Sequence, residues 1–309
     1  MGIKTLLSAK WGPIVAWQVC SLDLCLIGSI CSFIVKLYGS TIPLLMLSLA
    51  YLFLFIFNIW WYPKSDTPWW KYIIVAVAGL MGDYSAVEAY NTTSLASAML
   101  IVTTVVFWVA PLSFFILGRK ISKVQIMSIF LGAFGVFLVF LAEKSGGSRW
   151  QGNIWALISA ISYAISTVLQ EALVSSDSVR LLLIRFSVCA LPLSSLSSLF
   201  IEKERISRFK WETRSILLFT GYSIFLSFYY IMVPVILQYS NATVMNLSCL
   251  TSNFYSLGVS IVFFEFKASY MYVIGFLCIP IAITLFSLYP PSDEKLIMNE
   301  SLENTQEIS

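Results

Sequence analysis

Residues 124–142 read Val-Gln-Ile-Met-Ser-Ile-Phe-Leu-Gly-Ala-Phe-Gly-Val-Phe-Leu-Val-Phe-Leu-Ala, a run that contains no charged residue. A bilayer core is about 30 Å thick, and an α-helix needs about 20 mostly apolar residues to cross it. Because water does not reach the backbone there, a spanning segment must be a helix or a strand of a closed barrel. The apolar residues here are continuous rather than alternating, so the run predicts a transmembrane helix.

The rest of the chain has the same character. Its 309 residues are 59% hydrophobic and 11% charged, whereas soluble domains are about 25% charged. This composition excludes an ordinary soluble domain, a disordered chain and a protein that binds nucleic acid through a basic face. The formal net charge of +3 is too small to indicate a polyanionic partner. We therefore expect an all-α membrane protein, with the lipid bilayer as a partner and no nucleic acid.

Long apolar runs recur between short polar connections. We predict ten spanning helices, at residues 13–35, 42–62, 72–90, 95–117, 124–142, 154–174, 180–201, 215–237, 242–264 and 270–289. Prolines fall inside the fourth, seventh, eighth and tenth of these, where breaks in a membrane helix can serve bending. They are Pro111, Pro192, Pro234 and Pro280.

Two joints between helices resemble each other. Residues 90–97 read Tyr-Asn-Thr-Thr-Ser-Leu-Ala-Ser, and residues 239–246, which lie 149 positions later, read Tyr-Ser-Asn-Ala-Thr-Val-Met-Asn. Five spans per half would insert the second half upside down, which is the inverted-repeat plan of many secondary transporters. The alternative is that joints between apolar helices simply favour small polar residues.

The expected organisation follows from these repeats. It consists of a cytoplasmic N-terminus (1–12), a first five-helix repeat (13–142), a linker (143–153), a second five-helix repeat (154–289) and a polar cytoplasmic tail (290–309). Lysine and arginine in the connections of the first half favour a cytoplasmic N-terminus. The basic connection 202–214 disagrees, because this topology places it on the outer side.

Several ionisable residues fall inside predicted spans. An ionisable group in the bilayer costs about 2.5–3.5 kcal/mol on insertion scales and should face a cavity or a partner. Asp23 and Asp83 are the deepest, whereas Glu88, Glu171 and Glu265 lie near helix ends, where they can cap or reach the interface. For Asp23 and Asp83 the alternative to a functional role is a structural hydrogen bond within the membrane.

The ninth span is polar along its length. Asn246, Asn253 and Ser256 share one helical face, and Thr251 and Tyr255 lie on an adjacent stripe. Such a stripe either packs against another helix through hydrogen bonds or lines an aqueous path. In the sixth span, Ala156, Ala160 and Ala164 form a face suited to close packing.

Other absences narrow the chemistry. The chain has no histidine and no Gly-Lys dipeptide, so imidazole catalysis and a phosphate-binding P-loop are excluded. Its six cysteines lie in apolar stretches without a Cys-x-x-Cys pair. We expect no catalytic residue, no cofactor and no metal site, and we predict that the chain is not an enzyme.

Four short stretches are distinctive: Trp69-Trp-Lys-Tyr72, Ala89-Tyr-Asn-Thr-Thr-Ser94, Ser162-Tyr-Ala-Ile-Ser166 and Ser240-Asn-Ala-Thr-Val-Met-Asn-Leu-Ser-Cys-Leu-Thr-Ser252. Together they resemble solute carrier family 35, F subgroup, in the drug/metabolite transporter superfamily. The resemblance runs over about residues 12–290 in one register. It implies ten helices in two inverted five-helix repeats and transport of small organic solutes, since relatives in the wider family carry nucleotide sugars, nucleosides or nucleobase-like compounds.

The resemblance also implies site residues. These are Tyr90, Tyr163, Thr167, Glu171, Asn246, Thr251 and Tyr255, to which the polarity argument adds Asp23, Asp83 and Asn253. The chain departs from the subgroup at several acids: two of its aspartates fall on Val102 and Asn253, and a Glu-Glu pair is Gln170-Glu171. Asp83 and Glu88 stand at shifted positions as replacements.

The expected function is secondary-active transport of a small organic solute by alternating access, with a nucleobase-, nucleoside- or nucleotide-sugar-like substrate. An aromatic, amide-rich lining with few cations suits a neutral ring better than a phosphate. The alternative, favoured by the neutralised acids, is a non-transporting membrane receptor or scaffold on a transporter fold. The sequence does not distinguish the plasma membrane from endomembranes such as Golgi or vesicles. It also leaves the oligomeric state open, with a homodimer as one alternative.

Overall fold

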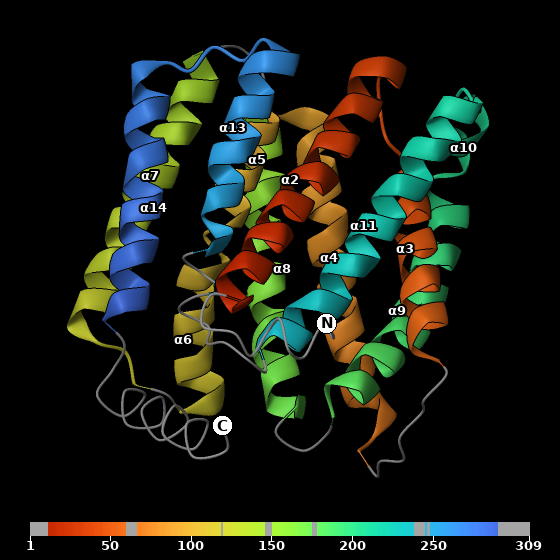
Figure 1. The fold of residues 1–309 in the computed structure, drawn as a ribbon, viewed down its shortest axis with the longest axis horizontal. Coiled ribbons are helices and arrows are strands. Elements are labelled where there is room, and N and C mark those ends of the chain that lie inside the picture. The colour runs from red at the N-terminus through yellow and green to blue at the C-terminus, as the bar shows by residue number, and fades with distance from the viewer. Residues whose placement is uncertain are drawn as a thin grey trace.

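The computed structural model describes residues 12–59, 67–118, 120–145, 150–174, 178–237, 245 and 248–289. These residues fold entirely into helices and short connections (Figure 1). The helices are α2 (Gly12–Tyr38), α3 (Pro43–Asn58), α4 (Trp69–Thr92), α5 (Leu95–Val102), α6 (Val105–Leu117), α7 (Lys123–Ser145), α8 (Trp150–Val174), α9 (Val179–Ile201), α10 (Lys203–Arg208), α11 (Thr213–Leu237), α13 (Thr251–Phe264) and α14 (Tyr270–Leu288). The predicted all-α class is confirmed.

Eight helical segments of the described chain are long and apolar enough to cross a membrane, and α3 and α13 are apolar but shorter. The predicted cytoplasmic tail 290–309 lies outside the described residues, and so does the N-terminus except for Gly12. The predicted linker 143–153 is narrower in the structure, because α7 extends to Ser145 and α8 begins at Trp150.

The predicted fourth span matches one candidate membrane segment, Leu95–Ile116, but a turn divides it into two helices. α5 ends at Val102 and α6 begins at Val105, with a turn at Thr103 and Thr104. Both threonine hydroxyls donate to backbone carbonyls of the preceding turn, at 2.7 and 2.6 Å. These local hydrogen bonds compete with helix continuation. Pro111 lies within α6 and does not end it.

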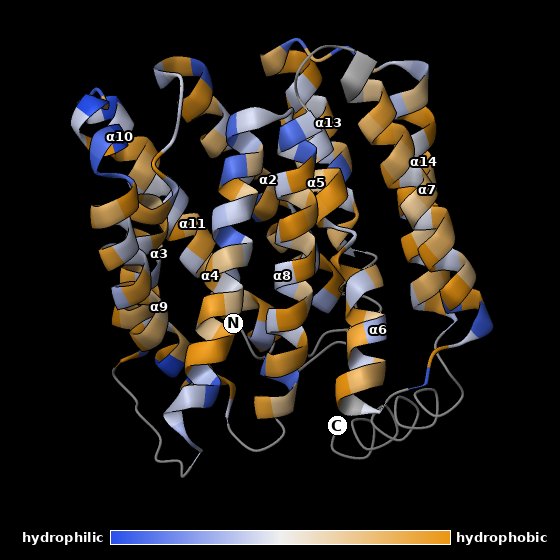
Figure 2. Cartoon of the chain, turned by 180° about the vertical axis from the view of Figure 1, so that it is seen from behind, coloured by the Kyte–Doolittle hydropathy of each residue, from blue (hydrophilic) through white to orange (hydrophobic). Residues whose placement is uncertain are grey.

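The outer faces of the bundle are apolar. Phe115 and Phe200 are 80% and 83% exposed, and Met127 and Phe130 are each 72% exposed. Figure 2 shows hydrophobic residues along α6, α7 and α14, whereas hydrophilic residues gather on α10 at one end. Exposed apolar area of this extent suits a lipid environment.

Helix pairs approach closely where small residues lie between them. α4 packs on α8, α7 on α14, α3 on α9 and α2 on α11. Between α3 and α11, Ser223 and Ser227 donate to the backbone carbonyls of Met46 and Ala50, at 3.1 and 2.7 Å. Serine and glycine at such contacts are typical of membrane helix packing, because they let backbones approach. The predicted alanine face of α8 (Ala156, Ala160, Ala164) is confirmed as fully buried.

A first prediction concerns the contact between α7 and α14. A Cβ at Gly275 would lie 2.7 Å from the backbone oxygen of Gly135, which cannot move aside as a side chain can. We expect Gly275→Ala to lower stability by about 1–3 kcal/mol, because the two helices must separate. Thermal unfolding of the purified protein in lipid nanodiscs measures this. Gly258→Ala is the matched control, since a Cβ there meets nothing within 4 Å; equal melting temperatures for the two variants would contradict the prediction.

Candidate functional site

A buried carboxylate lies at the centre of the bundle. Asp83 of α4 is 2% exposed and accepts hydrogen bonds from three tyrosine hydroxyls. Tyr163 of α8 donates at 2.6 Å and Tyr230 of α11 at 2.7 Å, and Tyr51 of α3 donates as well. We call Asp83 and these three tyrosines the tyrosine cage. Its members come from four helices, two in each half of the chain.

The neighbours of Asp83 in the sequence allow this arrangement. A Cβ at Gly82 would lie 2.6 Å from the ring of Tyr163, so glycine is what lets that ring pack against α4. Ser159, one turn earlier on α8, donates to the backbone oxygen of Gly82 at 2.8 Å. This contact holds α8 in register with α4.

Aromatic rings surround the cage on one side. Phe186 of α9 lies 5.7 Å from Tyr51 and 5.6 Å from Tyr230, measured between ring centroids. Tyr163 and Tyr230 are only half-buried, whereas Tyr51 is completely buried. Three hydroxyl donors offset the cost of placing a carboxylate in the membrane interior.

The polar stripe of α13 divides between two partners. Thr251 and Tyr255 both donate to the side-chain oxygen of Gln18 on α2, at 2.9 and 3.1 Å. Asn253 is completely buried, and its amide donates to the hydroxyl of Thr103 at 3.2 Å. The stripe therefore joins α13 to α2 and to the break between α5 and α6.

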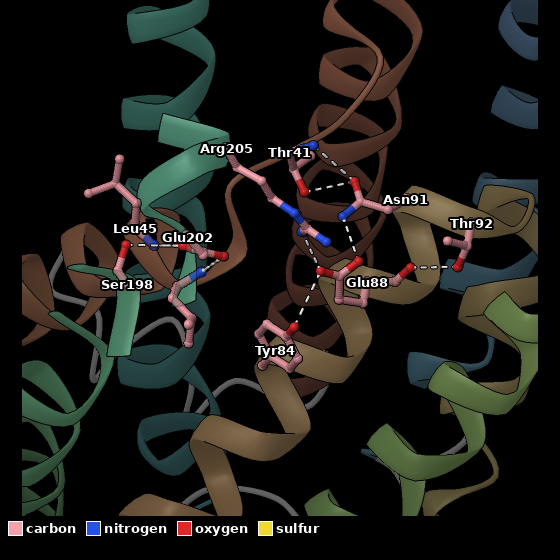
Figure 3. A network of polar contacts seen from close by, with 10 residues as sticks. Thr41, Leu45, Tyr84, Glu88, Asn91, Thr92, Ser198, Glu202 and Arg205 are labelled. Atoms are coloured by element: carbon pink, nitrogen blue, oxygen red, sulfur yellow. Dashed lines mark hydrogen bonds and ion pairs between the residues drawn. The ribbon is translucent and has the colours of Figure 1, made fainter. Parts of the chain in front are cut away.

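A second polar network closes one end of the bundle (Figure 3). Arg205 of α10 forms an ion pair of 2.5 Å with Glu88 of α4, which is 5% exposed. The amide of Asn91 donates to Glu88 at 3.0 Å, and its oxygen accepts from the backbone and hydroxyl of Thr41. We call Glu88, Arg205, Asn91 and Thr41 the end network. It ties the end of α4 to α10 and to the start of α3.

Glu202, between α9 and α10, holds the first turn of α3. Its carboxylate accepts from the backbone amides of Leu44 and Leu45, at 3.0 and 3.1 Å, and from Ser198 at 3.0 Å. Burial raises the pKa of Glu202, and these hydrogen bonds counteract part of that rise. Burial lowers the pKa of Arg205, but its hydrogen bond and ion pair with Glu88 outweigh burial, so that this pKa is raised.

A cavity of about 390 Å³ lies at the same end of the bundle, where α2, α4 and α13 finish. Its lining includes Tyr90, Asn91, Ser94, Lys36 and Glu265. Tyr90 reaches from there toward α2, because a Cβ at Gly28 would lie 3.2 Å from its hydroxyl. The predicted site residue Tyr90 is therefore closer to this end cavity than to the tyrosine cage.

The other predicted site residues are not gathered in one place. Thr167 is exposed on α8, and Glu171 near the end of that helix is half-buried. Asp23 is 4% exposed on α2, and Asn246 lies outside the described residues. The structure brings Asp83 and Tyr163 together, and it links Thr251 and Tyr255 through Gln18.

Sequence reasoning missed several members of these networks. Tyr51, Tyr230 and Phe186 are aromatic residues inside apolar runs, a pattern that lipid-facing or core residues share. The charge of Arg205 is one of several in its connection, so nothing local identified it as the partner of Glu88. An acid inside an apolar run indicates that some residue must donate a hydrogen bond to it. The sequence does not indicate which helix carries that donor.

The cage yields a prediction about stability. Tyr51→Phe removes one of three donors to a buried charge, so we expect a loss of about 1.5–3 kcal/mol in the free energy of unfolding. Denaturation followed by intrinsic fluorescence measures it. Tyr222→Phe is the control, since Tyr222 is a buried tyrosine of α11 that is not one of the three donors to Asp83. A larger loss for Tyr222→Phe than for Tyr51→Phe would refute the assigned role of the hydroxyl.

Known proteins place these features in a family. The profile described as "Solute carrier family 35" matches residues 8–288. Solute carrier family 35 member F2 of Mus musculus is 28% identical over 229 residues, which are 72% of this chain and 61% of that protein. The Xenopus tropicalis protein of the same name is 25% identical over 233 residues, or 71% and 59% of the two chains.

Further comparisons bear on length and fold. An uncharacterized solute carrier family 35 member of Schizosaccharomyces pombe is 24% identical over 226 residues, or 71% of this chain and 45% of that protein. The chain thus spans about half to three fifths of the length of these relatives. A solved crystal structure shares the fold with a TM-score of 0.58 at 15% identity, covering 89% of this chain and 97% of its own. The chain, an integral multi-pass membrane protein, belongs to solute carrier family 35, a family of transporters rather than enzymes.

Proposed function

We propose that the chain is a secondary transporter that carries a small organic solute by alternating access, with the tyrosine cage at its substrate site. The observation that carries this proposal is the composition of the cage. Asp83 and Tyr51 come from the first half of the chain, and Tyr163 and Tyr230 come from the second. A site built jointly by two halves changes when one half rocks against the other.

The pairing of helices supports two inverted repeats, 13–142 and 154–289, as the moving units. If each helix is exchanged for its counterpart in the other repeat, the pair α4–α8 becomes α11–α2, and α4–α9 becomes α11–α3. The pairs α3–α9, α7–α14 and α5–α13 map onto themselves. These pairs exchange among themselves, as a two-fold axis in the membrane plane would produce, whereas the pair α2–α4 has no comparable counterpart between α8 and α11.

Two broken helices meet near that proposed axis. The turn at Thr103 and Thr104 separates α5 from α6, and α13 begins after a turn at Leu250. Asn253 joins the two breaks through Thr103. Discontinuous helices line the substrate sites of many transporters, so we include Asn253, Thr251 and Tyr255 in the proposed site.

The chemistry of the cage favours a neutral nucleobase or nucleoside over a nucleotide sugar. Asp83 carries a negative charge that would repel a phosphate, and a carboxylate can accept from the N–H groups of a base. A phosphate would need a cation. Arg185, a cation within the described spans, lies against the rings of Trp69 and Tyr72 at the start of α4. The half-buried rings of Tyr163 and Tyr230 supply surfaces for stacking.

The end network is the proposed gate on one side of the site. Arg205 and Glu88 connect α10, which follows α9, with α4, which carries Asp83. Opening this end separates α10 from α4 and therefore requires the ion pair to break. Breaking the pair leaves the buried carboxylate of Glu88 without its half-exposed partner Arg205, which makes the closed state distinct.

Uptake by the purified full chain in proteoliposomes tests the function. We expect uptake of at least one member of a radiolabelled panel of nucleobases, nucleosides and nucleotide sugars, and we expect Asp83→Asn to reduce it more than tenfold. Loss of the charge weakens three hydrogen bonds and the proposed contact with substrate. Absence of uptake by folded wild-type protein across the panel would favour a non-transporting role, and unchanged uptake by Asp83→Asn would remove the cage from the site.

The gate generates a separate prediction. We expect Glu88→Gln and Arg205→Gln each to lower the turnover number about tenfold, equivalent to ~1.4 kcal/mol, and the double variant to be no worse than either. Initial uptake rates at saturating solute measure this. Arg208→Gln is the control, because its ion pair with Glu204 is exposed at 77% and 75%. Additive losses in the double variant would show that the two residues act separately.

A further inference from the structure

A second buried carboxylate, on α2, has an environment opposite to that of the cage. Asp23 is 4% exposed, and neither of its carboxylate oxygens has a hydrogen-bond partner among the described residues. Asp83 in contrast accepts from three hydroxyls. Both aspartates are buried inside the bundle, but the described residues supply hydrogen-bond donors to Asp83 and none to Asp23.

The surroundings of Asp23 provide no compensating charge. Its titratable neighbours are Cys20 on its own helix and Tyr229 on α11, and Cys249 before α13 lies beside both of these; all three are neutral near pH 7. On α4, Tyr90 lies beside Cys25 and Cys31 instead, and Asp83 belongs to the cage. On α13, Tyr255 donates to Gln18 of α2, and α5, the remaining helix packed on α2, has no titratable residue. Nothing described here would stabilise a negative charge on Asp23.

The nearby groups also fit a metal cation poorly. Hard cations need about six oxygen ligands, whereas thiols and one phenol surround Asp23. The described residues contain no cluster of three histidine, cysteine or acidic side chains able to hold a metal. The face of α2 that carries Asp23 also carries Ala16 and Cys20, which pack with Ile236 in an apolar cluster. A proton is the one positive species that such a dry site accommodates without further ligands.

We propose that Asp23 is the proton-binding site of this protein, occupied in the conformation described here. The acid O–H bond breaks when water reaches it, the electron pair stays on the carboxylate and the proton passes to that water. One proton is then bound and one released in each cycle. Its role as the coupling ion rests on the proposed transport function, but the bound proton itself does not.

α11 provides a physical link between the two carboxylates. Tyr230 donates to Asp83, and the preceding residue, Tyr229, lies beside Asp23. Pro234 lies within α11 and has no N–H to donate to the carbonyl of Tyr230, four residues earlier. The helix is therefore weakest where these two tyrosines stand. A bend of α11 that opens the cage also moves Tyr229 and admits water to Asp23.

Infrared difference spectroscopy of the full chain in lipid, without solute, tests the proton site. The protein carries ¹³C at its aspartate carboxyl groups, which separates their C=O bands from those of glutamates. We expect a protonated-carboxyl band at pH 7 that is lost in Asp23→Asn and retained in Asp83→Asn. The remaining aspartates, Asp66, Asp177 and Asp293, lie outside the described residues, and their exchange for Asn in a background variant keeps the assignment to Asp23 unambiguous.

Each result decides the proposal. A wild-type spectrum without this band, or a band that persists in Asp23→Asn, would overturn it. If Asp23→Asn does not fold, the Asp83→Asn variant in the same background leaves Asp23 as the one remaining aspartate, and the presence or absence of the band then decides. The outcome is independent of the uptake assay. A band without uptake would support the proton site and contradict the transport function. Uptake without a band would support the transport function and contradict the proton site.

Discussion

The burial of a carboxylate among tyrosine hydroxyls is the interaction on which the central packing depends. Asp83 can stay inside the bundle because Tyr51, Tyr163 and Tyr230 donate to it from three different helices. In a medium where water is absent, those donors cannot be replaced by solvent. The hydrogen bonds to the Asp83 carboxylate therefore constrain the positions of α3, α8 and α11 relative to α4.

Small residues then make that arrangement possible. Gly82 lets the ring of Tyr163 lie on α4, and Gly79 does the same for Phe186 of α9. Serines on α11 bond to the backbone of α3 at two successive turns. Without a hydrophobic force between helices in lipid, close backbone approach and such hydrogen bonds provide the attraction.

The sequence predicted the positions of the helices much better than it predicted which side chains bond to one another between them. Apolar runs determine where a chain crosses the membrane, so the ends of α4, α8 and α9 fall within four residues of the predicted limits. The break at Thr103 and Thr104 was not predicted, because two threonines in an apolar run do not by themselves end a helix. Asp83 and Asn253 stood out because polarity inside a span is costly. Tyr51, Tyr230 and Arg205 did not, since the identity of a partner depends on the tertiary arrangement.

The two networks around α4 share this helix, which supplies the coupling that the proposed gate and the proposed site require. Asp83 and Glu88 lie five positions apart on one helix, so a displacement of α4 at the cage is transmitted to the end network. Glu88 is held by Arg205 and by Asn91, whose own oxygen fixes Thr41 at the start of α3. α3 in turn supplies Tyr51 to the cage. The cage and the end network thus form a closed loop through α4 and α3, and a change in the hydrogen bonds at one is carried to the other by two helices rather than one.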